Sequence, residues 1–153
     1  TPSWVRTVSV PTTGSRGESR HGDRLGFPVV GVADLDRAAA FWAAALHLQV
    51  SEEWASPSWR TLTGPGGGRV LGLMHSASPP EPRPRLHLDL LVDTTDEQEA
   101  EVARLGSLGA TLPDWDGYPA EPDFVVLADP DGNVFCVVDL SRAPSSEAVG
   151  GGA

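Results

Sequence analysis

The sequence contains no lysine, and all 11 of its basic residues are arginine. Schiff-base catalysis and the lysine-dependent phosphate loop are therefore excluded, since both need a lysine amine. Cys136 is the only cysteine, so no disulfide can form within the chain and the fold must depend on its core. A single unpaired cysteine is typical of a protein from a reducing compartment.

Long hydrophobic runs are also missing. No stretch approaches the roughly 18 consecutive apolar residues that a membrane-spanning helix needs, and the N-terminus lacks the apolar run of a signal peptide. We therefore expect a soluble, cytoplasmic protein that does not enter a membrane.

Positive charge is scarce. The formal net charge is -10 at pH 7 and the isoelectric point is about 4.6, with no basic patch to reverse the field locally. Such a surface repels phosphate backbones and anionic lipids, which excludes nucleic acid and membrane partners. With 153 residues, of which 40% are hydrophobic, the chain is long enough for one compact domain or two small modules that share a core.

The first half of the chain predicts a strand, a helix and three further strands. The valine-rich run FPVVGV (27–32) is typical of a strand, and Asp34 is placed to cap the helix that follows. Arg37 is expected as a charge on the surface of that helix. Three strands are predicted after it, at 49–54, 59–62 and 70–75, with a turn at 64–68.

The second half repeats this order. LHLDLLVD (86–93) predicts a strand, and TTDEQEAEVARLGSLG (94–109) predicts a helix with Thr95 and Gln98 at capping-box spacing. Gly109 would stop this helix, and Arg104 is expected as a charge on its surface. The runs FVVLA (124–128) and VFCVVD (134–139) predict two strands joined by the turn DPDGN.

The two halves form an internal repeat. VADLD at 32–36 matches VDTTD at 92–96, and LTGPGGGR at 62–69 matches LADPDGNV at 127–134. The repeat predicts an α+β fold of two βαβββ modules, which pair as a curved mixed sheet around a cleft. The predicted divisions are a flexible lead-in at 1–24 with an optional extra edge strand, a first module at 25–75, a proline-rich linker at 76–85, a second module at 86–142 and a disordered tail at 143–153.

The stretch RLHLDL (85–90) places a titratable pair on a strand. Because successive side chains of a strand point to opposite faces, His87 and Asp89 share a face with Leu91. A histidine beside a carboxylate can act as a general acid or base, so these two are the candidate catalytic residues. The alternative is that both are polar residues of a pocket wall with no chemical role.

Four segments together resemble a known family. ADLDRAAAFWAAAL, RLHLDLLVD, LGSLGATL and LADPDGNVFCVVD resemble the vicinal oxygen chelate (VOC) superfamily of glyoxalases, bleomycin-resistance proteins and dioxygenases, and more narrowly its small actinobacterial glyoxalase-like branch. The likeness spans roughly residues 25 to 140. It implies paired βαβββ modules around a small-molecule pocket, and we expect a symmetric homodimer.

The resemblance also implies where a metal would be bound. In metal-dependent members each module supplies two ligands, commonly His and Glu. His87 stands at one such position, but its counterpart in the first module is Phe27. Cys136 occupies the glutamate position of the second module, and the counterpart there is Leu71 or Gly72.

This donor set is incomplete. A divalent ion needs three or more N, O or S donors in fixed geometry, so we expect no cofactor, while a divalent metal ion remains an alternative. In that alternative His87 would hold the metal with His75, Asp89 or Cys136. A further alternative makes Cys136 a nucleophile with His87 as its base.

Aromatic residues predict the wall of the cleft. The predicted ligand-binding residues are Trp54, Trp59, Trp115, Tyr118, Phe27, His75 and Cys136, with the loop 114–123 over them. Two functional hypotheses follow. The first is a protein that binds a planar or aromatic metabolite without a metal and without converting it; the second is a VOC-type lyase, isomerase or dioxygenase that uses an atypical metal set or His87 as general acid/base.

Overall fold

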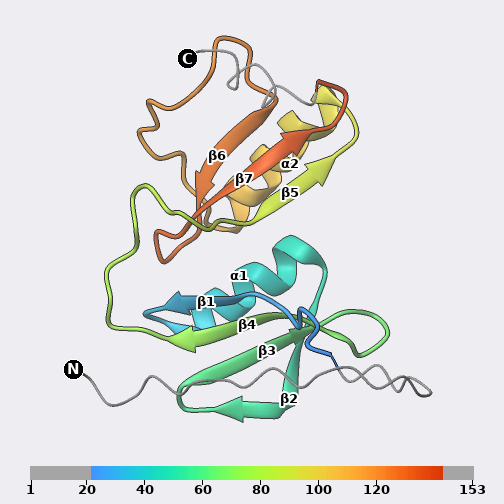
Figure 1. The fold of residues 1–153 in the computed structure, drawn as a ribbon, viewed down its shortest axis with the longest axis vertical. Coiled ribbons are helices and arrows are strands. Elements are labelled where there is room, and N and C mark those ends of the chain that lie inside the picture. The colour runs from blue at the N-terminus through green and yellow to red at the C-terminus, as the bar shows by residue number, and fades with distance from the viewer. Residues whose placement is uncertain (1–21, 143–153) are drawn as a thin grey trace, which may run out of the picture.

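The computed structural model describes residues 22–142, so the extra edge strand considered in the lead-in and the tail at 143–153 lie outside the described residues. Figure 1 shows two units of sheet and helix, joined by the segment between β4 and β5. The elements are β1 (Val29–Val32), α1 (Leu35–Leu46), β2 (Gln49–Ser56), β3 (Trp59–Thr63), β4 (Arg69–His75), β5 (Asp89–Val92), α2 (Thr95–Leu108), β6 (Phe124–Ala128) and β7 (Val134–Asp139).

Each unit contains a mixed sheet in which its first and last strands run parallel, side by side. The strand order is β1-β4-β3-β2 in the first sheet and β5-β7-β6 in the second. Val29 aligns with Gly72 in the first parallel pair, and Asp89 aligns with Cys136 in the second. The predicted α+β fold with two repeated units is confirmed, although the two sheets remain separate and do not close into a barrel.

The second unit has three strands, whereas the repeat predicted four. Its equivalent of β2 is reduced to a single bridge between Thr111 and Ala128. Pro113, Pro119 and Pro122 lie in the following loop, and a proline cannot donate to a strand ladder. The Tyr118 hydroxyl instead accepts a hydrogen bond from the backbone N–H of Val126 at 2.8 Å, so a side chain takes the place of the missing strand.

The N-cap residue of α1 is the one predicted from the sequence, whereas that of α2 is not. The Asp34 carboxylate accepts from the N–H of Arg37, as predicted. At α2 the prediction of Thr95 as the cap is wrong, because Thr94 is the N-cap and accepts from the N–H of Glu97. Thr95 donates its hydroxyl to Asp139 at 2.6 Å, since this residue faces β7 rather than the end of its own helix.

Gln98, the other residue of the predicted capping box, is buried beneath the second sheet. Its amide donates to the backbone carbonyls of Val137 at 2.9 Å and Asp123 at 3.1 Å. A buried amide without such partners would be costly, so these bonds tie α2 to the sheet. The αL conformation of Gly109, with φ 116°, ends α2 as predicted.

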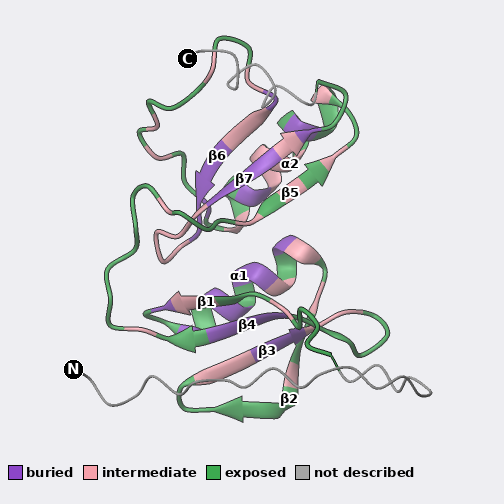
Figure 2. Cartoon of the chain, in the orientation of Figure 1, coloured by how far each residue is buried: buried purple, intermediate pink, exposed green. Residues whose placement is uncertain are grey.

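The core lies between each helix and its sheet and continues across the boundary between the units. Figure 2 shows buried residues on α1, β3, β4, β6 and β7, while β2 is exposed. Trp42 of α1 meets Phe135 of β7 with ring centroids 5.0 Å apart, and Phe41 meets Trp42 at 5.1 Å. Aromatic pairs of this kind contribute about 0.5–1.5 kcal/mol beyond their buried area, so the two modules share one core.

The DPDGN turn between β6 and β7 docks onto the first module. The indole N–H of Trp42 donates to the Asp129 carboxylate at 3.0 Å in a buried environment. Asp131 accepts from the backbone N–H groups of Ala33 and Asp34 and from Arg37, at 3.0, 3.2 and 3.0 Å. Arg37 is exposed on the surface of α1, as predicted, and also forms an ion pair between the modules, which was not predicted.

Arg104 makes a second polar contact between the modules, and its side chain is 32% exposed, so the prediction of a surface charge holds only in part. From α2, its guanidinium donates to the carbonyls of Ala44 and Ala45 at the end of α1, at 3.1 and 2.7 Å. Cationic groups stabilise the unpaired carbonyls of a helix C-terminus. Glu101 pairs with the same guanidinium at 2.6 Å, and this hydrogen bond lowers the pKa of the Glu101 carboxyl.

The two helices are short and amphipathic. Among residues 22–142, neither helix is long and apolar enough to cross a membrane.

Replacing Arg104 by Gln should destabilise the fold by about 1–3 kcal/mol, because the α1 carbonyls and Glu101 lose a charged donor. Denaturant unfolding of both proteins at neutral pH measures the difference. The difference should shrink as the pH falls below about 4, since the pKa of Glu101 is lowered by the pair and protonation of Glu101 removes that stabilisation. Arg85→Gln, in an exposed arginine of the linker, is the control, and equal effects of the two substitutions would contradict the role of Arg104.

Candidate functional site

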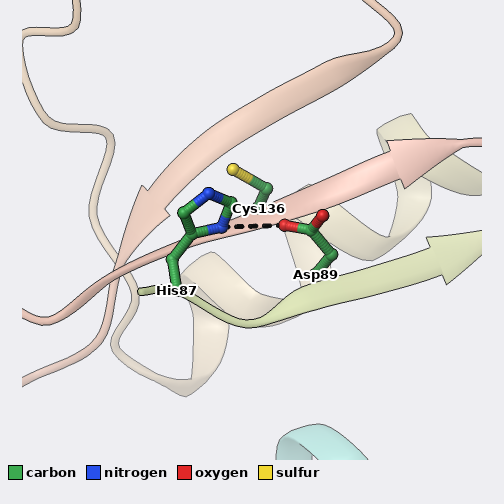
Figure 3. Close-up of side chains that lie close together, drawn as sticks. All are labelled: His87, Asp89 and Cys136. Atoms are coloured by element: carbon green, nitrogen blue, oxygen red, sulfur yellow. Dashed lines mark ion pairs between the residues drawn. The ribbon is translucent and has the colours of Figure 1, made fainter. Parts of the chain in front are cut away.

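Three side chains of the second module meet on one face of its sheet. Figure 3 shows His87, Asp89 and Cys136 side by side, where β5 and β7 run parallel. The His87 Nδ1 atom lies 2.9 Å from Asp89 Oδ1, and the donor atoms of all three residues lie within 4.8 Å of one another. The parallel register sets Asp89 beside Cys136, and the two-residue period of an extended segment brings His87 to the same face.

Two residues of this group are partly exposed to solvent. The side chain of His87 is 41% exposed and that of Asp89 is 48% exposed, so the pair is not buried. Leu88 and Leu90 pack against the core on the other side, and β5 begins only at Asp89. The histidine and aspartate therefore stand on an open sheet face where a ligand can reach them.

Cys136 differs from its two neighbours because it is buried. Desolvation, together with the negative charge of Asp89, raises the pKa of the Cys136 thiol to about 11. A thiol with this pKa is protonated at neutral pH, whereas nucleophilic catalysis needs a thiolate. Burial of the thiol therefore argues against Cys136 as a nucleophile with His87 as its base.

The register identifies the counterparts of this group in the first module. Because Asp89 aligns with Cys136 and Val29 aligns with Gly72, the equivalents of His87 and Cys136 are Phe27 and Gly72. Of the two residues that the sequence left open opposite Cys136, the register selects Gly72. The first module therefore offers no metal donor at these positions.

The space at the first-module position is filled by aromatic rings. A Cβ atom on Gly72 would lie 2.7 Å from the ring of Trp59 and 3.0 Å from that of Phe27, so both rings rest directly on the glycine. Phe27 and Trp59 meet edge to face with centroids 6.4 Å apart, and the Trp59 indole N–H donates to Thr61 at 2.7 Å. We call Phe27, Trp59 and Gly72 the aromatic platform.

Among the described residues, the group of side chains that could hold a divalent metal lies in the second module. His87, Asp89 and Cys136 supply one nitrogen, one oxygen and one sulfur donor, which would allow three-coordinate binding with an open position. His75, the last residue of β4, does not belong to this group. The usual set of two ligands from each module is not available within the described part of the chain.

The remaining predicted aromatic residues divide between the two modules. Trp54 is 50% exposed and lies with Phe27 beside Arg69 of the first module. Tyr118 stacks on Phe124 of the second module, with centroids 5.4 Å apart. The structure therefore does not gather the predicted residues into one aromatic cleft within the described chain.

Trp115 is held by the linker instead. Arg83 lies over its ring at 5.4 Å and forms an ion pair with the neighbouring Asp116. The indole N–H of Trp115 is buried without a hydrogen-bond partner among the described residues. These contacts fasten the loop 114–123 to the linker, which the sequence did not predict.

A pocket of about 320 Å³ lies where the modules join, and the sequence predicted a cleft between the modules but not its cover by the linker. Pro80 of the linker packs against Gly132 of the DPDGN turn and helps to cover the pocket, while His87 lies in its wall. The proline run in the linker was the available signal, since a stiff connector can cover a junction. Other lining residues are Val30, Trp42, Leu86, Asp131 and Phe135.

Solved structures with the same fold come from several bacteria. A glyoxalase/bleomycin resistance protein/dioxygenase family enzyme from Burkholderia phytofirmans PsJN is 21% identical, with a TM-score of 0.57 over 75% of this chain and 97% of that one. The fosfomycin resistance protein FosX from Listeria monocytogenes is 19% identical, with a TM-score of 0.59 over 83% and 96%. A glyoxalase/bleomycin resistance protein from Albidiferax ferrireducens T118 is 23% identical, with a TM-score of 0.52 over 75% and 97%.

These likenesses, all below 25% identity, show a shared fold. No curated protein sequence matches the chain. The family model of the glyoxalase-like domain matches residues 28–138, which run from the start of β1 almost to the end of β7. The chain therefore belongs to the glyoxalase-like domain family and has the fold of the VOC superfamily.

Proposed function

We propose that this protein binds a small planar or aromatic metabolite without a metal and without converting it. The observation that carries the proposal is the aromatic platform. Phe27 and Gly72 stand where metal-dependent relatives are expected to place ligands, and Phe27 and Trp59 cover the site. An aromatic surface with few polar groups is suited to stacking a flat ligand.

His87 and Asp89 would then act as polar contacts. Asp89 engages Nδ1 of His87 at 2.9 Å and so orients the ring, leaving Nε2 available for a ligand atom. The half-exposed position of both residues fits hydrogen bonding to a ligand from one side. In this role His87 and Asp89 fix the orientation of the bound ligand, while the apolar surface supplies most of the affinity for it.

We further propose a symmetric homodimer that brings the two kinds of site together. The open sheet faces carry exposed apolar side chains, which include Val29, Val70 and Met74 in the first module and Leu91 in the second. Pairing the first-module face of one copy with the second-module face of the other would bury these side chains. It would also place an aromatic platform opposite a His87–Asp89 pair.

The second candidate function is enzymatic, and the grouping of His87, Asp89 and Cys136 favours it. In this alternative His87 is a general acid/base whose orientation Asp89 fixes. A metal held by all three residues would instead supply Lewis-acid chemistry. The chain then would be a VOC-type lyase, isomerase or dioxygenase.

A panel of small aromatic metabolites, screened by tryptophan fluorescence, should yield ligands that mass spectrometry recovers unchanged. Gly72→Ala should weaken their binding about tenfold, because the new Cβ would displace Trp59 and Phe27. Gly106→Ala is the matched control, since a Cβ there meets open space. Unchanged affinity in folded Gly72→Ala protein would contradict the platform, and turnover of a ligand would favour the enzyme.

Treatment with a chelator, followed by dialysis, should leave the affinity for these ligands unchanged. The physical reason is that three donors from one module, one of them a thiol with a pKa of about 11, hold a divalent ion weakly at neutral pH. Elemental analysis and zinc titration measure the metal content. Stoichiometric zinc that is lost in both His87→Ala and Cys136→Ala would establish the metal-dependent alternative.

Leu91→Asp should shift the protein from dimer to monomer in sedimentation velocity, because a charge on the open face of β5 would be buried against the partner copy. Leu91 is 61% exposed, so the substitution should leave the monomer folded. Leu112→Asp is the control, since that leucine is 67% exposed but lies outside both sheets. A wild-type monomer, or a dimer that both variants keep, would contradict this assembly.

A further inference from the structure

Arg69, the first residue of β4, is held by two aromatic rings. Its guanidinium carbon lies 5.3 Å from the ring centroid of Phe27 and 5.3 Å from that of Trp54. Contacts with ring faces attract a guanidinium and restrict its motion, and they leave the N–H groups at its edge free to donate. Arg69 is therefore positioned before any ligand arrives.

Arg69 also differs from the arginines that tie this fold together. Arg37, Arg60, Arg83 and Arg104 pair with Asp131, Asp36, Asp116 and Glu101. Within residues 22–142, Arg69 has no carboxylate partner, although the whole chain carries a net charge of -10. Its charge is thus available to an anion from outside.

A pocket of about 540 Å³ adjoins this guanidinium. Arg24 and Arg69 contribute two positive charges to its lining and Glu53 contributes one negative charge. The pocket at the module junction is lined instead by the acidic residues Glu81 and Asp131 together with His87. The pocket beside Arg69 is therefore the one of these two that suits a negative group.

The same pocket combines this charge with an accessible ring. Trp54 is 50% exposed and lines the pocket with Phe27, a member of the aromatic platform. The β3–β4 turn at its edge ends in Gly67 and Gly68, and a Cβ atom at either position would meet nothing within 4 Å. A flat ligand can therefore reach the rings and the guanidinium together.

We propose that Arg69 recognises the carboxylate of a planar aromatic acid that stacks on Trp54 and Phe27. A guanidinium donates two parallel N–H bonds to a carboxylate, and such bidentate pairs are stronger than bonds between neutral groups. The inference rests on the proposed function, because it names the class of ligand that the aromatic surface binds. It makes Arg69 the residue that sets specificity for an anionic ligand.

The test compares two molecules of the same shape. 2-Naphthoate carries the carboxylate, and 2-naphthamide is its neutral counterpart, with binding of each measured by calorimetry on the full chain. Naphthoate should bind about tenfold more tightly than naphthamide, as expected for a charged hydrogen-bonded pair. Added salt should weaken naphthoate binding alone.

Variants assign the difference to Arg69. Arg69→Gln should reduce naphthoate affinity to that of naphthamide and leave naphthamide affinity within twofold. Arg85→Gln, in an exposed arginine outside this pocket, should change neither. Equal reductions in both variants would overturn the inference, because the preference would then come from overall charge.

The outcomes also separate this inference from the proposed function. If the wild-type protein binds naphthoate and naphthamide equally, the role of Arg69 is refuted while aromatic binding stands. If neither molecule nor any aromatic metabolite of the panel binds, both proposals fail. If Trp54→Ala leaves naphthoate binding unchanged, the carboxylate site is not the aromatic pocket described above, and the inference fails.

Discussion

The relation between the two modules depends on the buried carboxylate of Asp129. It is 2% exposed and accepts from the indole of Trp42 and from the backbone N–H groups of Asp131 and Asn133, at 3.0, 3.0 and 2.8 Å. Burial raises the pKa of Asp129, and these donors offset that cost. These donors come from both the turn and α1. The Asp129 carboxylate therefore has all of these hydrogen-bond partners only when β7 is docked against the first module. The positions of Phe27 and His87 relative to one another follow from that docking.

The repeat preserves backbone geometry while the chemistry of the two halves has diverged. β1 and β5 pair in parallel with the last strands of their sheets, so Phe27 and His87 occupy equivalent places, as do Gly72 and Cys136. One place carries no polar donor and is covered by aromatic rings, and the other carries a polar group. A repeat therefore predicts where a site lies more reliably than what the site binds. A ligand that needs both stacking and hydrogen bonds would use both halves.

The fold could be predicted from the sequence because its signals are local and repeated. Strand runs, the Asp34 cap and the Gly109 stop each depend on neighbouring residues, and the repeat indicated that both halves follow the same succession of strands and helix along the chain. The grouping of His87 with Asp89 followed from strand alternation. Features between distant residues were missed. They include the ties of Arg37 and Arg104 and the position of Arg69 beside Phe27 and Trp54. Nothing in sequence spacing encodes which carbonyl or ring a long arginine side chain will reach.

The electrostatics of the second-module group oppose the binding of a divalent ion at neutral pH. The pKa of the Cys136 thiol is raised to about 11 mainly by the loss of water on burial, and further because its thiolate would lie next to Asp89. A metal would have to displace this proton and also share Asp89 with His87 Nδ1. In the first module, Gly72 offers no donor to compensate. Under the proposed function, the protonated thiol of Cys136 and the His87 ring that Asp89 orients would contact the edge of a flat ligand without a metal.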